Sequence, residues 1–348
     1  MSELRQILDL WKRATAAGEE ICLATVVGIE GSAYRRPGAR MLLTSTGLRA
    51  GTISGGCLEA EVVKKAWWLT AQGPAIQRYS SFFDDDGDMP YGLGCGGTVI
   101  VLLERGEAAA ASLEALRRSS EERTPSVILT DTAVEQPGTV LILNHAGEAV
   151  FERAADSQLR AAAREALQAR ESRRFGQTFI EYVAPPLALF VFGAGDDAQP
   201  LVELASSLGW HVAVADGRTN LARAERFPRA ARVQVLDESL AANPEDAAVI
   251  MTHSYEQDAR LLRMLLPLRL RYLGILGPKL RTERLVTEVA PQLGLDPAAC
   301  MARLHSPVGL DIGGHSPATI ALSIAAEIQA EFSGRPARSG ASAEPVHA

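Results

Sequence analysis

Residues 187–218 read LALFVFGAGDDAQPLVELASSLGWHVAVADGR, and this stretch decides the fold of the C-terminal part of the chain. It consists of an apolar run, a glycine turn, a segment with helical periodicity, and a second apolar run that ends on an acid. Gly193 permits a tight turn, Gly195 lets the backbone approach a pyrophosphate, and Ala198 is the small residue that completes a dinucleotide-binding fingerprint. The stretch therefore predicts the first strand, helix and second strand of a Rossmann-type domain.

The acid that ends this stretch, Asp216, favours NAD(P) as a ligand, because a carboxylate there can accept hydrogen bonds from the adenosine ribose. Arg218 follows two residues later and is able to pair with a 2′-phosphate, so NAD and NADP both stay open. Asp196 and Asp197 suit the start of a helix, but they repel a pyrophosphate. The alternative is a Rossmann fold whose nucleotide site is vacant or reused.

The chain of 348 residues is long enough for two domains. Ala184–Pro186 separates them, because two prolines remove backbone donors and hold the chain extended. We predict an α/β protein in which a mixed α+β domain, residues 1–184, precedes a Rossmann-like parallel-sheet domain, residues 187–332. Residues 333–348 are small and polar, which predicts a disordered tail.

The N-terminal domain combines helical and strand patterns. Its first 20 residues predict an amphipathic helix with Leu4, Ile7, Leu8 and Trp11 on one face. Further helices are expected over residues 58–71, 108–118 and 156–170. Strands are expected over residues 21–31, 76–83, 98–103, 126–130, 139–144, 149–153 and 178–184, with two short ones within 41–56.

The bulk properties exclude several functional classes. A net charge of −7 supplies no basic field, which excludes nucleic acid as a partner. The first residues lack the apolar core of a signal peptide, and no run of about 18 apolar residues follows, so we expect a cytoplasmic protein without a membrane span. The four cysteines have no CxxC spacing, which indicates neither a zinc site nor a disulfide scaffold.

A glycine-rich loop, TISGGC, carries residue types that suit a bound anion. Gly55 and Gly56 precede a predicted helix, whose start offers free N–H groups and favours a thiolate at Cys57. Ser54 adds a hydroxyl donor. The alternative is that Cys57 is a small buried side chain beside structural glycines.

A second glycine-rich loop, GLGCGG, presents Cys95 beside Gly96 on a backbone that a ligand can approach closely. Here too, burial beside structural glycines is the alternative. Cys22 lies within an apolar strand pattern and Cys300 near the end of a predicted helix, so we expect both to be structural.

Three other positions are candidates for a binding site. Arg36 can place its guanidinium fork against a phosphate, although exposed arginines are usually only solvated. His253 follows a predicted strand at its carboxyl end, where open α/β sheets bind ligands, and Asp258 is placed to orient it. Asp311 and His315 flank a glycine pair beside a predicted helix start. For His253 and Asp258, a capping role or a satisfied role in the core is the alternative.

Several segments resemble, in order over residues 1–332, the XdhC/CoxI family of accessory proteins for xanthine dehydrogenase and related molybdenum hydroxylases. Besides the Rossmann stretch they are GSAYRRPGARMLLTSTG, GTISGGCLEAEV, GLGCGG, MTHSYEQD, YLGILGPKLR and LHSPVGLDIGGHSPATIALSIAAEI. The chain departs from the family at Pro278, where members commonly have serine.

The resemblance implies a chaperone, rather than a catalyst, that binds the molybdenum cofactor (molybdopterin) and protects it while its terminal sulfur is installed. The cofactor would then be delivered to a molybdenum hydroxylase of the xanthine dehydrogenase type. The resemblance makes Cys57 the candidate contact to molybdenum, and it leaves a cysteine desulfurase partner and a homodimer open. The alternatives are an NAD(P)-dependent oxidoreductase with its substrate near His253, and a scaffold that only binds proteins.

Overall fold

The computed structural model describes residues 2–56, 58–80, 97–237 and 242–334. The chain forms two compact units, an N-terminal unit over Glu3–Pro186 and a C-terminal unit that begins at Leu187. Within the described ranges, no helix is long and apolar enough to cross a membrane. The fold class is α/β, and each unit is described below by itself.

The first sheet of the N-terminal unit is antiparallel, with the strand order β3-β2-β1-β5-β4. Its strands are β1 (Ile21–Gly31), β2 (Arg40–Thr44), β3 (Arg49–Gly51), β4 (Ala75–Ser80) and β5 (Gly97–Arg105). Helix α2 (Glu59–Leu69) packs on one face of this sheet through Leu58, Val62 and Ala66. The two short strands expected within residues 41–56 are confirmed, and the second of them ends at Gly51, so that TISGG is a loop.

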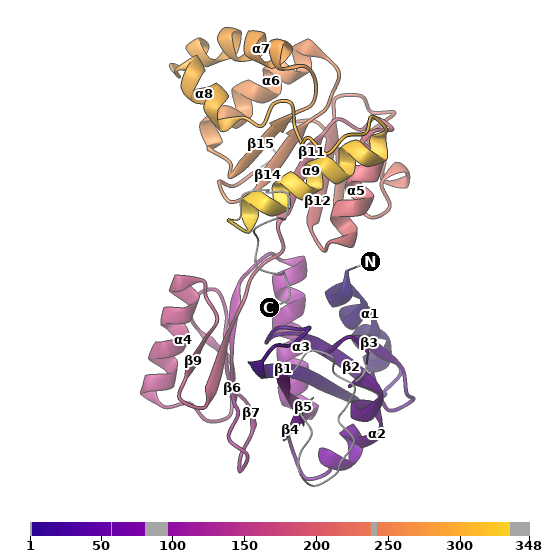
Figure 1. Cartoon of the computed structure of the whole chain (residues 1–348), viewed down its shortest axis with the longest axis vertical. Coiled ribbons are helices and arrows are strands. Elements are labelled where there is room, and N and C mark those ends of the chain that lie inside the picture. Colours follow the sequence, from indigo (N-terminus) through magenta and orange to yellow (C-terminus); the bar gives the residue numbers. More distant parts are fainter. Residues whose placement is uncertain (1, 57, 81–96, 238–241, 335–348) are drawn as a thin grey trace. The chain divides into compact units, whose positions relative to one another are not determined.

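The second sheet of this unit is also antiparallel, with the order β8-β7-β6-β10-β9. Its strands are β6 (Ser126–Asp131), β7 (Gly138–Leu143), β8 (Ala149–Glu152), β9 (Arg173–Phe175) and β10 (Thr178–Val183). Helix α4 (Ser157–Ala169) packs on one face through Ala162, Ala163 and Ala166. Figure 1 shows α3 (Gly106–Glu121) among the strands of both sheets.

Helices α1 (Glu3–Ala16) and α3 share a core with the inner faces of both sheets. The predicted face of α1 is confirmed, since Ile7 and Leu8 are buried and Leu4 and Trp11 are partly buried against the same core. An ion pair also joins the sheets. The guanidinium of Arg40 on β2 donates to both carboxylate oxygens of Glu181 on β10, at 2.8 and 2.5 Å.

The sheet of the C-terminal unit is parallel, with the order β13-β12-β11-β14-β15. Its strands are β11 (Ala188–Phe192), β12 (His211–Asp216), β13 (Arg232–Val235), β14 (Ala247–Ile250) and β15 (Tyr272–Ile275). The predicted Rossmann-type arrangement is confirmed. Because every strand points the same way, their carboxyl ends meet at one edge, where such sheets bind ligands.

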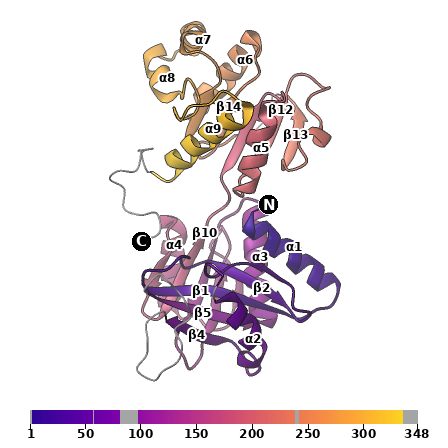
Figure 2. The same ribbon diagram turned by 45° about the vertical axis from the view of Figure 1, so that its right-hand side comes forward.

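Helices cover both faces of this sheet (Figure 2). Helices α5 (Ala198–Ser207) and α9 (Pro317–Phe332) pack together on one face. The other face carries α6 (Tyr255–Leu265), α7 (Lys279–Gln292) and α8 (Pro297–Arg303), with a short 3₁₀ turn at Leu266–Leu268. A second 3₁₀ turn, Ala224–Arg226 (η1), is followed by Phe227, which packs in the core of the α5 and α9 face. The predicted cap of α9 is confirmed, since Ser316 accepts a hydrogen bond from the Thr319 amide and Pro317 follows it.

Candidate functional site

The glycine turn after β11 brings two strand ends into contact. Gly193 has φ +122°, and a Cβ atom there would lie 2.4 Å from the carbonyl oxygen of Met251, just after β14. Only glycine therefore fits between these backbones. The Gly193 amide also donates to the carbonyl of Ala215 on β12, at 2.9 Å. The predicted role of Gly193 in a tight turn is confirmed.

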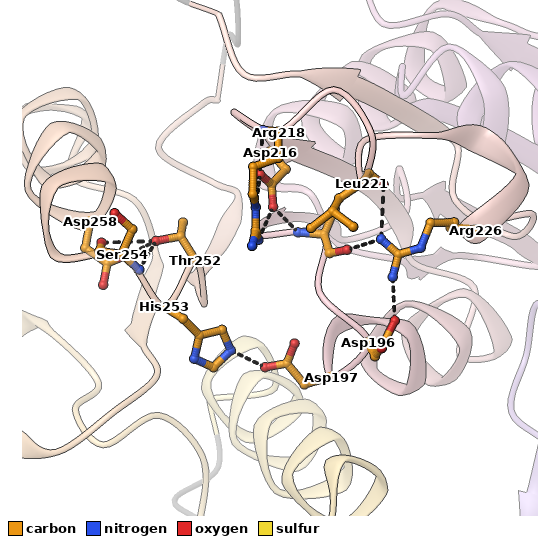
Figure 3. A network of polar contacts seen from close by, with 11 residues as sticks. Asp196, Asp197, Asp216, Arg218, Leu221, Arg226, Thr252, His253, Ser254 and Asp258 are labelled. Carbon is orange, nitrogen blue, oxygen red and sulfur yellow. Dashed lines mark hydrogen bonds and ion pairs between the residues drawn. The ribbon is translucent and has the colours of Figure 1, made fainter.

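The carboxylate of Asp216 at the end of β12 is fully engaged (Figure 3). Among the residues that the structure describes, it accepts four hydrogen bonds: one from the Ala194 amide, at 2.7 Å, and three from the amide, Nε and terminal nitrogen of Arg218, at 2.8, 3.0 and 2.8 Å. A carboxylate has about four lone-pair positions. No acceptor position is left for a ribose hydroxyl while Arg218 stays in place.

The environment of Asp216 also favours its charged form. Burial of the side chain acts to raise the pKa, but hydrogen bonds from the Arg218 side chain and from the Ala194 and Arg218 amides outweigh it, so the pKa lies below its usual value. A dinucleotide must therefore displace a charge-assisted pair before it reaches this carboxylate. The arrangement does not fit the usual binding of NAD(P), and the predicted contact between Asp216 and a ribose stays a prediction.

The two acids at the start of α5 are each paired with a base. Asp196 lies 2.6 Å from Arg226, which also donates to the Ala194 carbonyl at 2.6 Å. Asp197 lies 2.7 Å from Nε2 of His253 (Figure 3), whose positive φ of 59° is uncommon for a residue with a Cβ atom. The carboxylates beside the glycine turn thus contact basic side chains from η1 and from the segment after β14.

The expectation that Asp258 orients His253 is wrong. Asp258 is buried on α6, where it accepts a hydrogen bond from Thr252 at 2.5 Å and pairs with Arg281 of α7 at 2.6 Å. Asp197 instead contacts the imidazole. Thr252 and His253, the second and third residues after β14, point in different directions, so Thr252 binds the buried acid and His253 turns towards Asp197 at the start of α5 (Figure 3).

In the N-terminal unit, Glu59 organises the TISGG loop. Its buried carboxylate accepts hydrogen bonds from the amides of Ile53 and Ser54, at 3.0 and 2.8 Å, and from the Ser54 hydroxyl, at 2.6 Å. Ser54 Oγ in turn accepts from the amides of Gly56 and Leu58, at 3.1 and 3.2 Å. The hydroxyl proton of Ser54, predicted as a donor to a ligand, is therefore used within the loop.

The glycines of this loop lie beside the segment that contains Arg36. Gly55 and Gly56 are exposed, and Gly56 has φ +118°. A Cβ atom on Gly55 would lie 3.9 Å from the ring of Tyr34. Arg36 is exposed, and its guanidinium has no hydrogen bond or ion pair with any residue in the described ranges. Two of the sequence motifs thus meet at one surface of the N-terminal unit.

The pKa of Glu59 makes this loop sensitive to acid. Burial acts to raise the pKa, and hydrogen bonds from the Ser54 hydroxyl and from the amides of Ser54, Glu59 and Ile53 outweigh it, so the folded-state pKa lies below the usual 4.5. A depressed carboxyl pKa adds stability above the unfolded pKa, and this stability is lost as the pH falls through the folded pKa.

We therefore expect Glu59→Gln to be less stable than the wild type at neutral pH, and the difference to shrink as the pH falls below about 4. Urea unfolding of both proteins between about pH 3 and 7 measures this difference. A difference in the free energy of unfolding that stays constant over this range would contradict the assignment.

The cysteine predictions divide between described and undescribed residues. Cys57, Cys95 and Gly96 lie outside the described residues. Cys22 and Cys300 are buried, as expected for structural side chains, and burial raises the pKa of the Cys22 thiol to about 12. Across the described ranges, no group of three or more His, Cys, Asp or Glu side chains is placed to hold a metal ion.

Asp311 lines a cavity of about 440 Å³ in the C-terminal unit. The cavity lies between residues 307–315 and the first turns of α9, beyond the end of β15. The predicted site residues thus fall into three groups. Gly193, Gly195, Asp216 and His253 lie at the glycine turn, Asp311 lines the cavity, and Ser54, Gly55, Gly56 and Arg36 lie in the N-terminal unit.

Sequence reasoning missed two residues that organise these groups. Glu59 had no spacing signal, because it lies five residues after Ser54, whereas a capping box places the acid three residues after the serine. Arg226 had none, since it reaches the glycine turn from a 3₁₀ turn 30 residues further along the chain.

Comparisons with known proteins agree with this architecture. Residues 14–80 match the family described as "XdhC and CoxI family", and residues 189–328 match the one described as "XdhC Rossmann domain". The crystal structure of a xanthine dehydrogenase from Bacillus halodurans superposes with a TM-score of 0.77 at 29% sequence identity, covering 98% of each chain.

Two curated relatives match over most of their length. One, from Bacillus subtilis, is named as a probable xanthine dehydrogenase subunit and is 33% identical over 89% of this chain and 92% of its own. "Molybdenum cofactor insertion chaperone PaoD" of Escherichia coli is 24% identical over 93% of this chain and 87% of its own. Together with the two family matches and the shared fold, these alignments show that the chain belongs to the XdhC and CoxI family.

Proposed function

We propose that this protein binds the molybdenum cofactor and inserts it into a molybdenum hydroxylase of the xanthine dehydrogenase type. The observation that carries the proposal is the alignment over 93% of this chain with a relative named as a molybdenum cofactor insertion chaperone. The hydrogen bonds that Asp216 already makes also support the proposal, because they occupy the carboxylate that usually accepts hydrogen bonds from the ribose of a dinucleotide.

The cofactor is cargo in this proposal, and each unit offers candidate contacts to it. In the N-terminal unit, the exposed Arg36 is free of partners within the described ranges, and it lies two residues after Tyr34, whose ring is close to the exposed Gly55. An unpaired guanidinium on a surface segment that adjoins an open glycine loop suits a phosphate group, which the cofactor carries. We further propose that the protein protects the cofactor during sulfuration. In this scheme Cys57 contacts the metal, and a cysteine desulfurase is the second partner.

The test uses the full chain and cofactor released from a purified molybdoenzyme under anaerobic conditions. After gel filtration, we expect the protein to retain molybdenum and pterin together, and the loaded protein to activate an apo-hydroxylase faster than free cofactor does. An activation rate equal to that of free cofactor, with no molybdenum retained, would overturn the proposal. Tight binding of NADH with hydride transfer would favour the oxidoreductase instead.

A matched pair of variants tests the phosphate contact. We expect Arg36→Ala to weaken cofactor retention about tenfold, because a charge-assisted hydrogen bond to phosphate is lost. Arg49→Ala removes another exposed arginine of the same unit, on β3, and should leave retention unchanged. Equal retention by both variants would remove Arg36 from the proposed site.

A further inference from the structure

The cavity beside α9 combines apolar walls with a few polar groups. Its apolar lining includes Leu276 at the end of β15, Val308 and Ile320. Asp311, His315 and Thr319 supply polar groups. A volume of about 440 Å³ is within the range of small-molecule sites, which are mostly apolar with a few placed polar groups. The cavity therefore has the size and lining expected for a ring system with a polar edge.

Tight packing holds the loop that forms this cavity against α9. Gly309 has φ +96°, and a Cβ atom there would lie 2.4 Å from Ser323 Oγ. Gly314 has φ +91°, and its Cβ would lie 2.7 Å from Thr319. The Ser323 hydroxyl also donates to the Leu310 carbonyl. The cavity wall is thus positioned by close contacts at both ends of the 309–314 loop.

A partly buried network anchors the start of this loop. Glu327 on α9 accepts hydrogen bonds from the Tyr272 hydroxyl, at 2.5 Å, and from the Gly309 amide, at 2.9 Å, and it pairs with His305 at 3.2 Å. Burial acts to raise the pKa of Glu327, and the hydrogen bonds from His305, Tyr272 and Gly309 outweigh it and lower the pKa. The contacts of Glu327 therefore hold the start of the loop in place.

Asp311 differs from Glu327, because its carboxylate has no hydrogen bond or ion pair with any residue in the described part of the chain. It is also not needed as a helix cap, since Ser316 already accepts the hydrogen bond from the Thr319 amide. Its acceptor positions at the cavity are therefore available to a ligand.

The chemistry of a carboxylate selects among heterocycles. Its two oxygens accept two parallel hydrogen bonds from adjacent N–H groups. The 2-amino-4-oxopyrimidine edge of a pterin presents two such donors, the ring N3–H and the 2-amino group. The adenine edge instead places an acceptor nitrogen beside its amino group, and that nitrogen repels a carboxylate. An acid beside apolar walls thus favours a pterin over an adenine.

We propose that the cavity between the 307–315 segment and α9 binds the pterin ring of the cofactor, with Asp311 accepting hydrogen bonds from N3–H and the 2-amino group. This inference rests on the proposed function and deepens it by naming the part of the cargo that the C-terminal unit recognises. Leu276, Val308 and Ile320 cover the ring.

The test measures fluorescence of 6-hydroxymethylpterin on titration with the full chain. 6-Hydroxymethyllumazine, in which an oxo group replaces the 2-amino group, and adenosine serve as matched ligands. We expect the wild type to bind the pterin at least about tenfold more tightly than either, because one charge-assisted hydrogen bond is replaced by repulsion. Asp311→Asn should lose about tenfold or more in affinity for the pterin and most of its preference over lumazine.

The control variant is Glu203→Gln, an exposed acid on α5, which should bind all three ligands like the wild type. Equal pterin affinity in the wild type and Asp311→Asn would overturn the assignment of Asp311, and equal affinity for pterin and adenosine would overturn the ring assignment. The proposed function would survive both outcomes if the wild type still retained molybdenum. If the wild type retained no molybdenum, the proposed function would be overturned as well.

Discussion

Replacing Gly193 with alanine is expected to destabilise the C-terminal unit by about 3–5 kcal/mol, which combines backbone strain with overpacking. The new Cβ atom would lie 2.4 Å from the carbonyl oxygen of Met251, and this neighbour is backbone, so no side-chain rotation relieves the contact. The φ of +122° is also unfavourable for any residue with a side chain. Either β11 or β14 must move, and the site at their carboxyl ends moves with them.

Calorimetry of the full chain measures this effect as a lower unfolding temperature of the C-terminal unit. The matched control is Gly294→Ala, at the end of α7, where φ is +68° and a Cβ atom would meet nothing within 4 Å. We expect the control to cost only about 1 kcal/mol, the penalty of the left-handed conformation. Equal destabilisation by the two variants would show that the contact with Met251 is unimportant.

Replacing Arg40 with alanine is expected to destabilise the N-terminal unit by about 3–5 kcal/mol, the usual cost of breaking a buried ion pair. The side chains of Arg40 and Glu181 are only 6% and 12% exposed. The variant leaves the Glu181 carboxylate between the two sheets without its guanidinium partner. Urea unfolding monitored by circular dichroism gives the change in the free energy of unfolding.

Two further variants show whether the pairing itself causes the loss. Arg40→Met combined with Glu181→Leu removes both charges and should recover most of the stability, because an apolar pair avoids the desolvation cost. Arg78→Ala breaks the ion pair with Glu30, whose side chains are 55% and 56% exposed, and should cost less than about 1 kcal/mol. A double variant no more stable than Arg40→Ala would contradict this account.

The elements of the fold follow from local signals. The order of apolar run, glycine turn and amphipathic segment over residues 187–218 predicted β11, α5 and β12, and the structure confirms all three. Strand β9 was not predicted, because its sequence, Arg173–Phe175, is short and polar and lies at a sheet edge. Such a strand forms only because β10 offers unpaired backbone groups beside it.

The candidate sites were harder to predict from the sequence than the elements of the fold. The motifs located the glycine turn, the TISGG loop and the segment that contains Asp311, because glycines and caps mark such loops directly. The partners of the polar side chains were not predictable. The Ser54 hydroxyl, predicted as a donor to a ligand, donates to Glu59, a partner that the sequence did not indicate. His253 was expected beside Asp258, and it instead contacts Asp197.

The sequence by itself determined where strands, helices and close backbone approaches occur, since each depends on apolar periodicity or on the presence of a glycine at one position. Only the tertiary structure decided which charges meet. Asp197 and His253 are 56 residues apart and pair because the sheet order places β14 beside β11. Residue type specifies a charge, but its partner depends on which strand ends lie side by side. Asp216 is engaged by Arg218, only two residues further along the chain, while Asp311 lines its cavity.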